Sequence, residues 1–308
     1  MGKKDTITKE YMSEPEYFAD AFNYFMFDGM QMIDKKNLSV MDAAELGLIF
    51  AEENKEIIQK VRDVLKECVI MEDEKSFYLI LGIENQSNVH YAMPVKNMIY
   101  DALNYGRQAS EKAKRHKKEK DIQGSEFISG FSKMDKLKPV ITLVVYFGTE
   151  EWDAPRSLKK MFEEVNEDVL KYVSDYKVNL LIPKEIDDFS KFKTEFGKAM
   201  KYISVSDNKE ACEIVANEEP YKVINVETAR LLNECVGMNI VVEKGANQMK
   251  VCEAVKGFRE EGRLEGRLEG IQALVKTLQE MGQTNDFIIK TVVEKFSLSE
   301  KEAMKYIK

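Results

Sequence analysis

Three polar residues lie beside an apolar segment that the sequence predicts as one strand of a buried β-hairpin. Glu84 follows residues 77–83, which are all apolar or glycine, and Gln86 comes two residues later. Because side chains alternate along a strand, Glu84 and Gln86 would lie on one face. If the polar turn before this strand is symmetrical, Asp63 of the preceding strand lies directly opposite Glu84, with Cβ atoms roughly 5 Å apart. A turn longer by one residue would place Val64 there instead.

Two facing carboxylates that are removed from water either share a proton or hold a cation. The chain has only two histidines, so a metal site built on these acids would use oxygen ligands, which favour Mg²⁺ or Mn²⁺ over zinc. Such an ion can acidify a water molecule and neutralise charge during phosphodiester hydrolysis. In the alternative interpretation, Asp63 is a surface residue paired with Arg62 or Lys60, and Glu84 is a loop carboxylate.

Alternating helical and strand patterns surround these residues. Residues 14–33 read as a helix that is interrupted at Asp28 and Gly29. Strands are predicted at residues 61–71, 77–83, 139–147 and 178–182, and the last three of them read as buried. Helices are predicted from Pro94 onward, at residues 157–173 and over much of residues 186–258. Helices that alternate with buried strands predict an α/β fold with crossover connections.

The helix that begins at Pro94 leads into a basic stretch. One of its faces is apolar and consists of Val95, Met98, Ile99, Ala102 and Leu103. Residues 107–120 hold seven Lys or Arg against two Glu, a local net charge of +5. Lys96 in the first turn suits a phosphate. The candidates for contact with a nucleic-acid backbone are Lys112, Lys114, Arg115, Lys117 and Lys118. Solvated helix ends and an ordinary surface lysine are the alternatives.

The overall composition narrows the class of protein. The 308 residues are 44% hydrophobic and carry 46 Lys and Arg against 54 Asp and Glu, a net charge of −8. These values exclude a disordered chain and a globally basic nucleic-acid coat. The apolar runs are shorter than the roughly 20 residues that span a bilayer, and the start of the chain lacks an apolar signal core. Four dispersed cysteines indicate neither a disulfide framework nor a zinc site. We therefore expect a cytoplasmic protein with no membrane partner.

The C-terminal region carries a short repeat. The tetrad Glu-Gly-Arg-Leu recurs over residues 261–270, and in a helix Gly262, Gly266 and Gly270 would form one row. Such a row lets a second copy approach closely, so we expect the tail to support a homo-oligomer; a flexible spacer is the alternative. The predicted division of the chain is a main domain at residues 1–250, a Gly-rich helical linker at 251–270 and a small helical tail at 271–308.

Motifs over most of the chain resemble those of the Rpn recombination-promoting nucleases, a family of YhgA-like transposases in the PD-(D/E)XK nuclease superfamily. The resemblance is carried by FADAF at 18–22, RD at 62–63, GIENQS at 82–87, MPVK at 93–96, YDALNY at 100–105, YFG at 146–148, WDAPRSL at 152–158 and the repeats of the tail. It implies an α/β restriction-endonuclease-like αβββαβ core, with a mixed sheet flanked by helices, and metal-dependent cleavage of DNA.

Residue by residue, the resemblance implies that Asp63 and Glu84 are the two catalytic acids and metal ligands. Gln86 stands at the position where the superfamily usually has lysine, an E-x-Q form that is usual in this family. Glutamine can hydrogen-bond water and phosphate but supplies no positive charge. Asp20 matches a recurrent acid of the family and is a further candidate ligand, although a solvated helix acid is the alternative.

The sequence therefore predicts a Mg²⁺- or Mn²⁺-dependent DNA endonuclease associated with recombination or mobile elements. Asp63, Glu84 and Gln86 would form its catalytic site. The alternatives are a non-catalytic nucleic-acid-binding protein with a degenerate nuclease fold, in which Gln86 marks lost activity, and a nuclease that acts on RNA.

Overall fold

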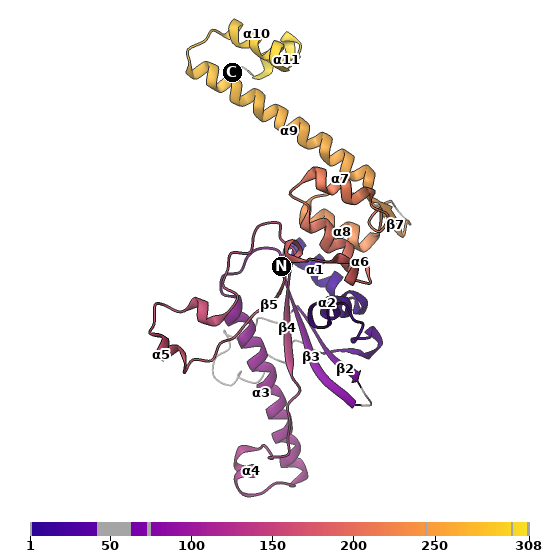
Figure 1. The fold of residues 1–308 in the computed structure, drawn as a ribbon, viewed down its shortest axis with the longest axis vertical. Coiled ribbons are helices and arrows are strands. Elements are labelled where there is room, and N and C mark those ends of the chain that lie inside the picture. Colours follow the sequence, from indigo (N-terminus) through magenta and orange to yellow (C-terminus); the bar gives the residue numbers. More distant parts are fainter. Residues whose placement is uncertain (1, 42–62, 73–74, 244, 297, 307–308) are drawn as a thin grey trace.

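A mixed β-sheet with helices on both faces forms the centre of the computed structural model (Figure 1). The structure describes residues 2–41, 63–72, 75–243, 245–296 and 298–306. The strands are β1 (Leu38–Val40), β2 (Val64–Glu72), β3 (Lys75–Gln86), β4 (Val140–Tyr146), β5 (Asn179–Leu181), β6 (Val223–Asn225) and β7 (Gln248–Lys250). The helices are α1 (Lys3–Ser13), α2 (Pro15–Phe27), α3 (Met93–Glu119), α4 (Gly124–Ser129), α5 (Glu167–Leu170), α6 (Glu195–Ser204), α7 (Lys209–Asn217), α8 (Val226–Val236), α9 (Val251–Glu280), α10 (Asn285–Phe296) and α11 (Glu300–Ala303).

The main sheet has the strand order β1-β2-β3-β4-β5. β1, β2 and β3 pair antiparallel, whereas β4 is parallel to both β3 and β5. A parallel pair needs a crossover, and α3 provides it between β3 and β4. The succession of helix, three strands, helix and strand is the αβββαβ order that the family resemblance implies, and the α/β prediction is confirmed.

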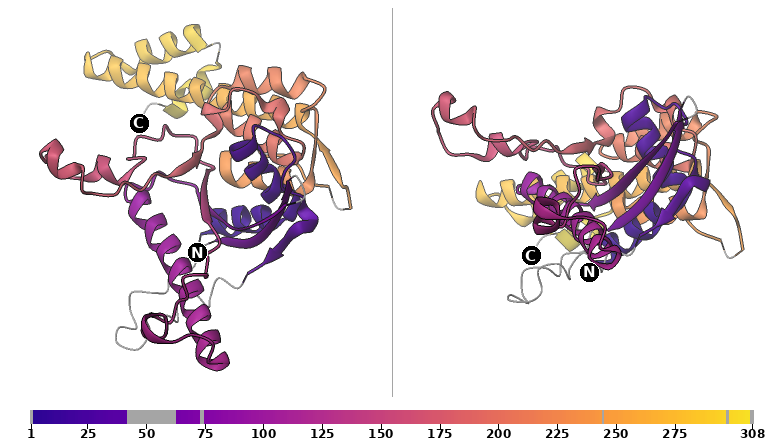
Figure 2. Two further views of the ribbon diagram at one scale, coloured as in Figure 1. Left: turned by 60° about the horizontal axis from the view of Figure 1, so that its bottom comes forward. Right: turned by 90° about the horizontal axis from the view of Figure 1, so that it is seen from below.

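The two faces of the sheet differ in what they contact. Leu81 and Ile83 of β3 belong to the main hydrophobic core together with residues of α1 and α2. The alternate residue Ile80 joins a smaller cluster with Leu65 and Val140, against which Leu103 of α3 packs. Figure 2 shows α3 on the side of the sheet away from the N-terminal helices. Glu84, four residues after Ile80, therefore belongs to the α3 face.

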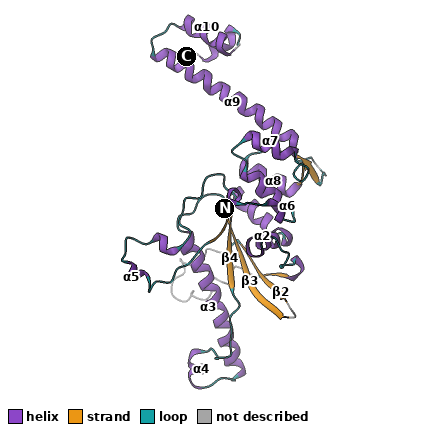
Figure 3. Cartoon of the chain, in the orientation of Figure 1, coloured by secondary structure: helices purple, strands orange, loops and turns teal. Residues whose placement is uncertain are grey.

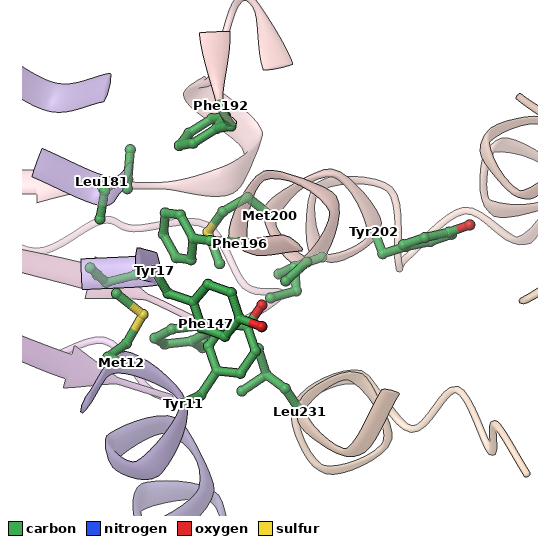
Figure 4. Packing of buried hydrophobic residues seen from close by; sticks show 14 of the residues in the cluster. Tyr11, Met12, Tyr17, Phe147, Leu181, Phe192, Phe196, Met200, Tyr202 and Leu231 are labelled. Carbon is green, nitrogen blue, oxygen red and sulfur yellow. The ribbon is translucent and has the colours of Figure 1, made fainter. Parts of the chain in front are cut away.

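The main core extends from the sheet into the helices that follow β5. Figure 4 shows Tyr11 and Tyr17 beside Phe147, the residue after β4, and Leu231 of α8. The rings of Tyr11 and Tyr17 stack with centroids 4.4 Å apart. α6, α7 and α8 contribute buried residues to the same cluster, so they pack onto the sheet domain as one core.

The interruption predicted at Asp28 and Gly29 is confirmed. α2 ends at Phe27, and Asp28 adopts the left-handed conformation with φ 54°. Gly29 follows at φ 85°, where a Cβ atom would lie only 2.8 Å from the Lys191 carbonyl oxygen. A glycine is therefore required here both by the backbone angle and by the close approach of the segment before α6.

The helix predicted at residues 157–173 is wrong. The segment contains a short 3-10 turn at Leu158–Met161 and the single turn of α5. The Asn166 side chain accepts a hydrogen bond from the Asp168 N–H, and the Asp175 carboxylate accepts one from the Lys159 N–H. These side chains satisfy backbone donors locally and so compete with a continuous helix.

α3 turns an unexpected face toward the sheet. Its buried side chains include Asn97, Asp101 and Asn104, whereas Ile99 of the apolar face is half exposed. The Asp101 carboxylate accepts hydrogen bonds from the Thr142 hydroxyl at 2.6 Å and from the Tyr176 hydroxyl at 2.5 Å. These polar contacts hold the helix on the sheet together with the apolar contacts of Met93 and Leu103.

The C-terminal region is helical, as predicted. The repeat at residues 261–270 lies inside α9, which continues from the sheet domain to a small cluster with α10 and α11 (Figure 3). A capping box opens α11, because the Glu302 carboxylate accepts from the Ser299 N–H at 2.9 Å. None of the helices in the described part of the chain is both long and apolar enough to cross a bilayer.

Candidate active site

The register of the β2–β3 hairpin brings Asp63 opposite Glu84. Val64 pairs with Ile83 and Glu72 pairs with Lys75, so the turn is symmetrical. Asp63 directly precedes Val64, and continuing the register by one residue places it across from Glu84. The Asp63 Oδ2 atom accepts a hydrogen bond of 3.0 Å from the Asn85 N–H. This bond fixes the Asp63 carboxylate at the end of β3.

Lys96 joins the two acids from the first turn of α3. Its Nζ atom lies 2.7 Å from the Glu84 Oε2 atom, and the Glu84 side chain is only 2% exposed. A carboxylate at this depth needs a positive partner, because burial disfavours its charged form. Lys96 also lowers the pKa of Asp63 through its charge, so one ammonium group acts on both acids.

The pKa of Asp63 reflects two opposing influences. Burial raises it, while the Asn85 N–H hydrogen bond and the Lys96 charge lower it, and the net direction is upward. A proton therefore competes for this carboxylate more effectively than in water. A divalent ion bound here would displace that proton, because the positive charge of the ion favours the ionised form of the Asp63 carboxylate.

Gln86 lies at the end of β3, beside Tyr146 of β4 in the parallel register. Its Nε2 atom donates to the Asn85 carbonyl at 3.0 Å. The site therefore lies at the carboxyl ends of β3 and β4 and next to the first turn of α3. In α/β sheets this position commonly binds ligands, and the helix N-terminus favours anions.

Two asparagines that sequence reasoning did not identify lie next to Lys96 and Glu84 in the chain. Asn97 follows Lys96 and is fully buried, and Asn85 follows Glu84 and is 8% exposed. In the described part of the chain, both side-chain amide atoms of each residue have no hydrogen-bond partner. Buried amides are normally paired, so these two are available to water or to a bound group. The helical polar stripe formed by Asn97, Asp101 and Asn104 is the signal that could have revealed Asn97.

The structure connects Asp20 with a different element. Its carboxylate accepts hydrogen bonds from the Lys193 N–H and from the N–H and hydroxyl of Thr194, the residue that caps α6. Asp20 is 1% exposed. Among the described residues, its hydrogen bonds thus join it to the start of α6 rather than to Asp63 and Glu84.

The predicted basic residues lie along the last turns of α3. Lys114, Lys117 and Lys118 are exposed. Lys112 and Arg115 instead contact the Asp135 carboxylate at 3.3 and 3.1 Å. The basic stretch therefore contains both outward charges and charges that hold the segment before β4 against α3.

The carboxylate oxygens of Asp63 and Glu84 are the kind of ligand that a hard divalent ion prefers. Mg²⁺ is often bound by one or two carboxylates, with water and substrate phosphate oxygens completing its shell. No group of three or more His, Cys, Asp or Glu side chains that could hold a metal occurs among the described residues. Within the described part of the chain, a metal at this site would use the two acids, and water or substrate oxygens would complete its shell.

Comparison with known proteins identifies the family. Residues 3–218 match the model of the family described as "Putative transposase, YhgA-like". This match covers well over half of the chain, and the chain belongs to this family. The searches of curated proteins and of solved structures returned no match.

Proposed function

We propose that the protein is a divalent-metal-dependent endonuclease that hydrolyses phosphodiester bonds of DNA. The observation that carries this proposal is the convergence of Asp63, Glu84 and Lys96 at the carboxyl end of β3. Two acids and a cation on the open end of a sheet are suited to bind a metal ion and a phosphate together. The family membership supports a role in mobile elements and an interaction with DNA.

In the proposed hydrolysis, four side chains of the site have separate roles. Asp63 and Glu84 would hold the ion, which supplies an acidified water and neutralises charge on the phosphate. The Gln86 amide, on the same face of β3, would orient that water through a hydrogen bond. Lys96 would contact a phosphate oxygen and provide the positive charge that Gln86 lacks, since its side chain is 22% exposed and reaches the buried Glu84 carboxylate.

The Lys96–Glu84 ion pair also favours a second candidate function. An ammonium group on the catalytic acid occupies one of the places where a metal would bind, and a permanent pair would leave a fold that binds nucleic acid without cleaving it. The two functions differ in whether a divalent ion displaces Lys96 from Glu84.

Nicking of supercoiled plasmid by the purified protein tests the proposal. We expect cleavage with Mg²⁺ or Mn²⁺, none with EDTA, and a loss of at least about a hundredfold in Glu84→Gln, because removing one ligand charge weakens both metal binding and transition-state stabilisation. Glu185→Gln is the matched control, since Glu185 is an exposed carboxylate paired with Arg156. Equal cleavage by wild type and Glu84→Gln would refute the assignment.

A further inference from the structure

A basic pocket lies on the same side of the sheet as the candidate active site, further along α3. Its volume is about 380 Å³, and residues of α3, β2, β3 and the segment before β4 line it. Five basic side chains surround it, against the two acids Glu67 and Glu111. The basic residues are Arg107, Lys112, Arg115, Lys136 and Lys138. The lining is therefore strongly suited to an anion.

The existing ion pairs leave positive charge in the pocket. Arg107 contacts Glu111 at 2.8 Å, and Lys138 pairs with Glu67. Lys136, by contrast, makes no ion pair with any residue that the structure describes. One partner of each pair remains open to solvent, since Glu111 is 57% and Lys138 is 43% exposed, so a phosphate can approach these pairs and compete for their cations.

A buried amide adds a directed donor. Asn104 lines the pocket and is 1% exposed. Its Oδ1 atom accepts a hydrogen bond of 3.1 Å from Gln108, which also bonds the backbone of Lys138 through both its amide nitrogen and its amide oxygen. These bonds fix the Asn104 side chain, and the Asn104 Nδ2 donor has no partner in the described part of the chain. A buried donor that is left unpaired indicates a missing acceptor.

The position of the pocket suits a polymer better than a separate small anion. Ile80 lines it, and Glu84 lies four residues further along the same strand and on the same face. At 3.3 Å per residue, the two positions are about 13 Å apart. A DNA strand carries one phosphate at every nucleotide, so a strand bound at Glu84 can place another of its phosphates in this pocket.

We propose that this pocket binds a second backbone phosphate of the DNA strand whose scissile phosphate lies at Asp63 and Glu84. The inference rests on the proposed function for the identity of the ligand. The pocket would determine which way the strand runs across the sheet and add affinity that does not depend on base sequence. Its binding of phosphate is independent of the metal, so DNA binding and cleavage can be measured separately.

Binding of a labelled DNA duplex in EDTA, followed by fluorescence anisotropy over a range of salt concentrations, tests the pocket. We expect Arg107→Gln/Lys136→Gln to weaken binding roughly tenfold at low salt and to lower the slope of log K against log salt by about 0.9 for each phosphate that the variant no longer neutralises. Asn104→Asp should weaken binding as well, because it replaces the donor with an acceptor of equal size. Lys276→Gln/Lys290→Gln removes the same charge from exposed positions of α9 and α10 and is the matched control.

The outcomes separate this inference from the proposed nuclease. If the pocket variants and the control bind with equal affinity and slope, or if the wild type does not bind DNA, the pocket assignment is wrong. If the pocket variants bind more weakly while the wild type cleaves no DNA with any divalent ion, the pocket stands and the nuclease proposal fails.

Discussion

Lys96 is the side chain that most directly controls the charge at the candidate site. It neutralises the buried Glu84 carboxylate at 2.7 Å and also lowers the pKa of Asp63. Gln86 stands where the resemblance to the PD-(D/E)XK nucleases leads us to expect a lysine. In the proposed nuclease, Lys96 of the adjacent helix would supply that positive charge, and the two positions should be able to substitute for each other.

This interpretation predicts what happens when the positive charge is moved from position 96 to position 86. Lys96→Met should reduce metal-dependent cleavage by about tenfold to a hundredfold, since the phosphate then has one positive partner fewer. Adding Gln86→Lys to that variant should restore part of the rate, because Gln86 lies on the same face of β3 as Glu84. Cleavage rates of the single and double variants, measured at saturating Mn²⁺, test this prediction. If Gln86→Lys has the same effect with and without Lys96, the two positions do not share a role.

At the residue scale the sequence predicted the acids better than their partners. The Asp63–Glu84 pairing followed from the symmetry of the hairpin, and the structure confirms that register. Lys96 was predicted to contact phosphate, but its ion pair with Glu84 was not predicted. The Lys96–Glu84 contact depends on how α3 packs on the sheet. Hydrophobic periodicity in the sequence gives no information about that packing.

At the scale of elements, α3 shows why periodicity alone was insufficient. Its apolar residues Val95, Met98 and Ile99 form the most obvious stripe, yet Asn97, Asp101 and Asn104 face the sheet. Hydrogen bonds to Thr142 and Tyr176 compensate for the burial of Asp101. A polar buried face is uncommon in a helix, so a pattern that assumes an apolar interface selects the wrong side. The structure of such a helix depends on partners from distant segments.

The far end of α3 is held by a buried histidine. His116 lies 2.7 Å from the Asp121 carboxylate and 2.8 Å from the Asp135 carboxylate, and Arg115 and Lys112 also face Asp135. The hydrogen bonds of Asp121 and Asp135 raise the pKa of His116. Burial alone would raise the pKa of Asp135, but hydrogen bonds from Ser132, His116 and Lys112 lower it. The cluster fixes the segment that carries Lys136 and Lys138 into the basic pocket.

The stability that His116 provides should depend on pH. A raised pKa in the folded state means that the stabilisation is complete below the ordinary value of 6.5 and is lost as the pH rises through the raised pKa. The melting temperature of the wild type should therefore exceed that of His116→Gln most clearly in mildly acidic solution, and the difference should shrink at alkaline pH. Thermal scans of both proteins across this range provide the test. A difference that does not change with pH would show that the histidine acts only by packing.

At the scale of the whole molecule, one long helix connects the sheet domain to the C-terminal helices. α9 begins beside α7 and extends to the cluster with α10 and α11 (Figure 1). The sequence predicted a Gly-rich helical linker at residues 251–270 and a small helical tail at 271–308, and α9 spans the linker and the first part of the tail, to Glu280. Glycines lower helix propensity but do not by themselves end a helix, which explains the continuous α9.

The tail should affect assembly without contributing to chemistry. A chain that ends after Gly266 keeps the part of α9 beside α7 and loses α10 and α11. We expect this variant to retain metal-dependent cleavage, because Asp63, Glu84 and Lys96 lie in the sheet domain, and to have a lower apparent mass by light scattering than the full chain. If both proteins are monomers, the tail does not mediate self-association. If the shortened protein is folded but inactive, the tail contributes to the active site.

The proposed nuclease depends above all on Asp63 and Glu84 acting together on one divalent ion. Calorimetric titration with Mn²⁺ measures this directly, because stoichiometry and affinity are obtained without DNA. We predict one ion per chain for the wild type and for Glu185→Gln, and a loss of at least about tenfold in affinity for both Asp63→Asn and Glu84→Gln, since each removes one charged ligand. Unchanged Mn²⁺ affinity in either acid variant would contradict a metal site shared by these two residues.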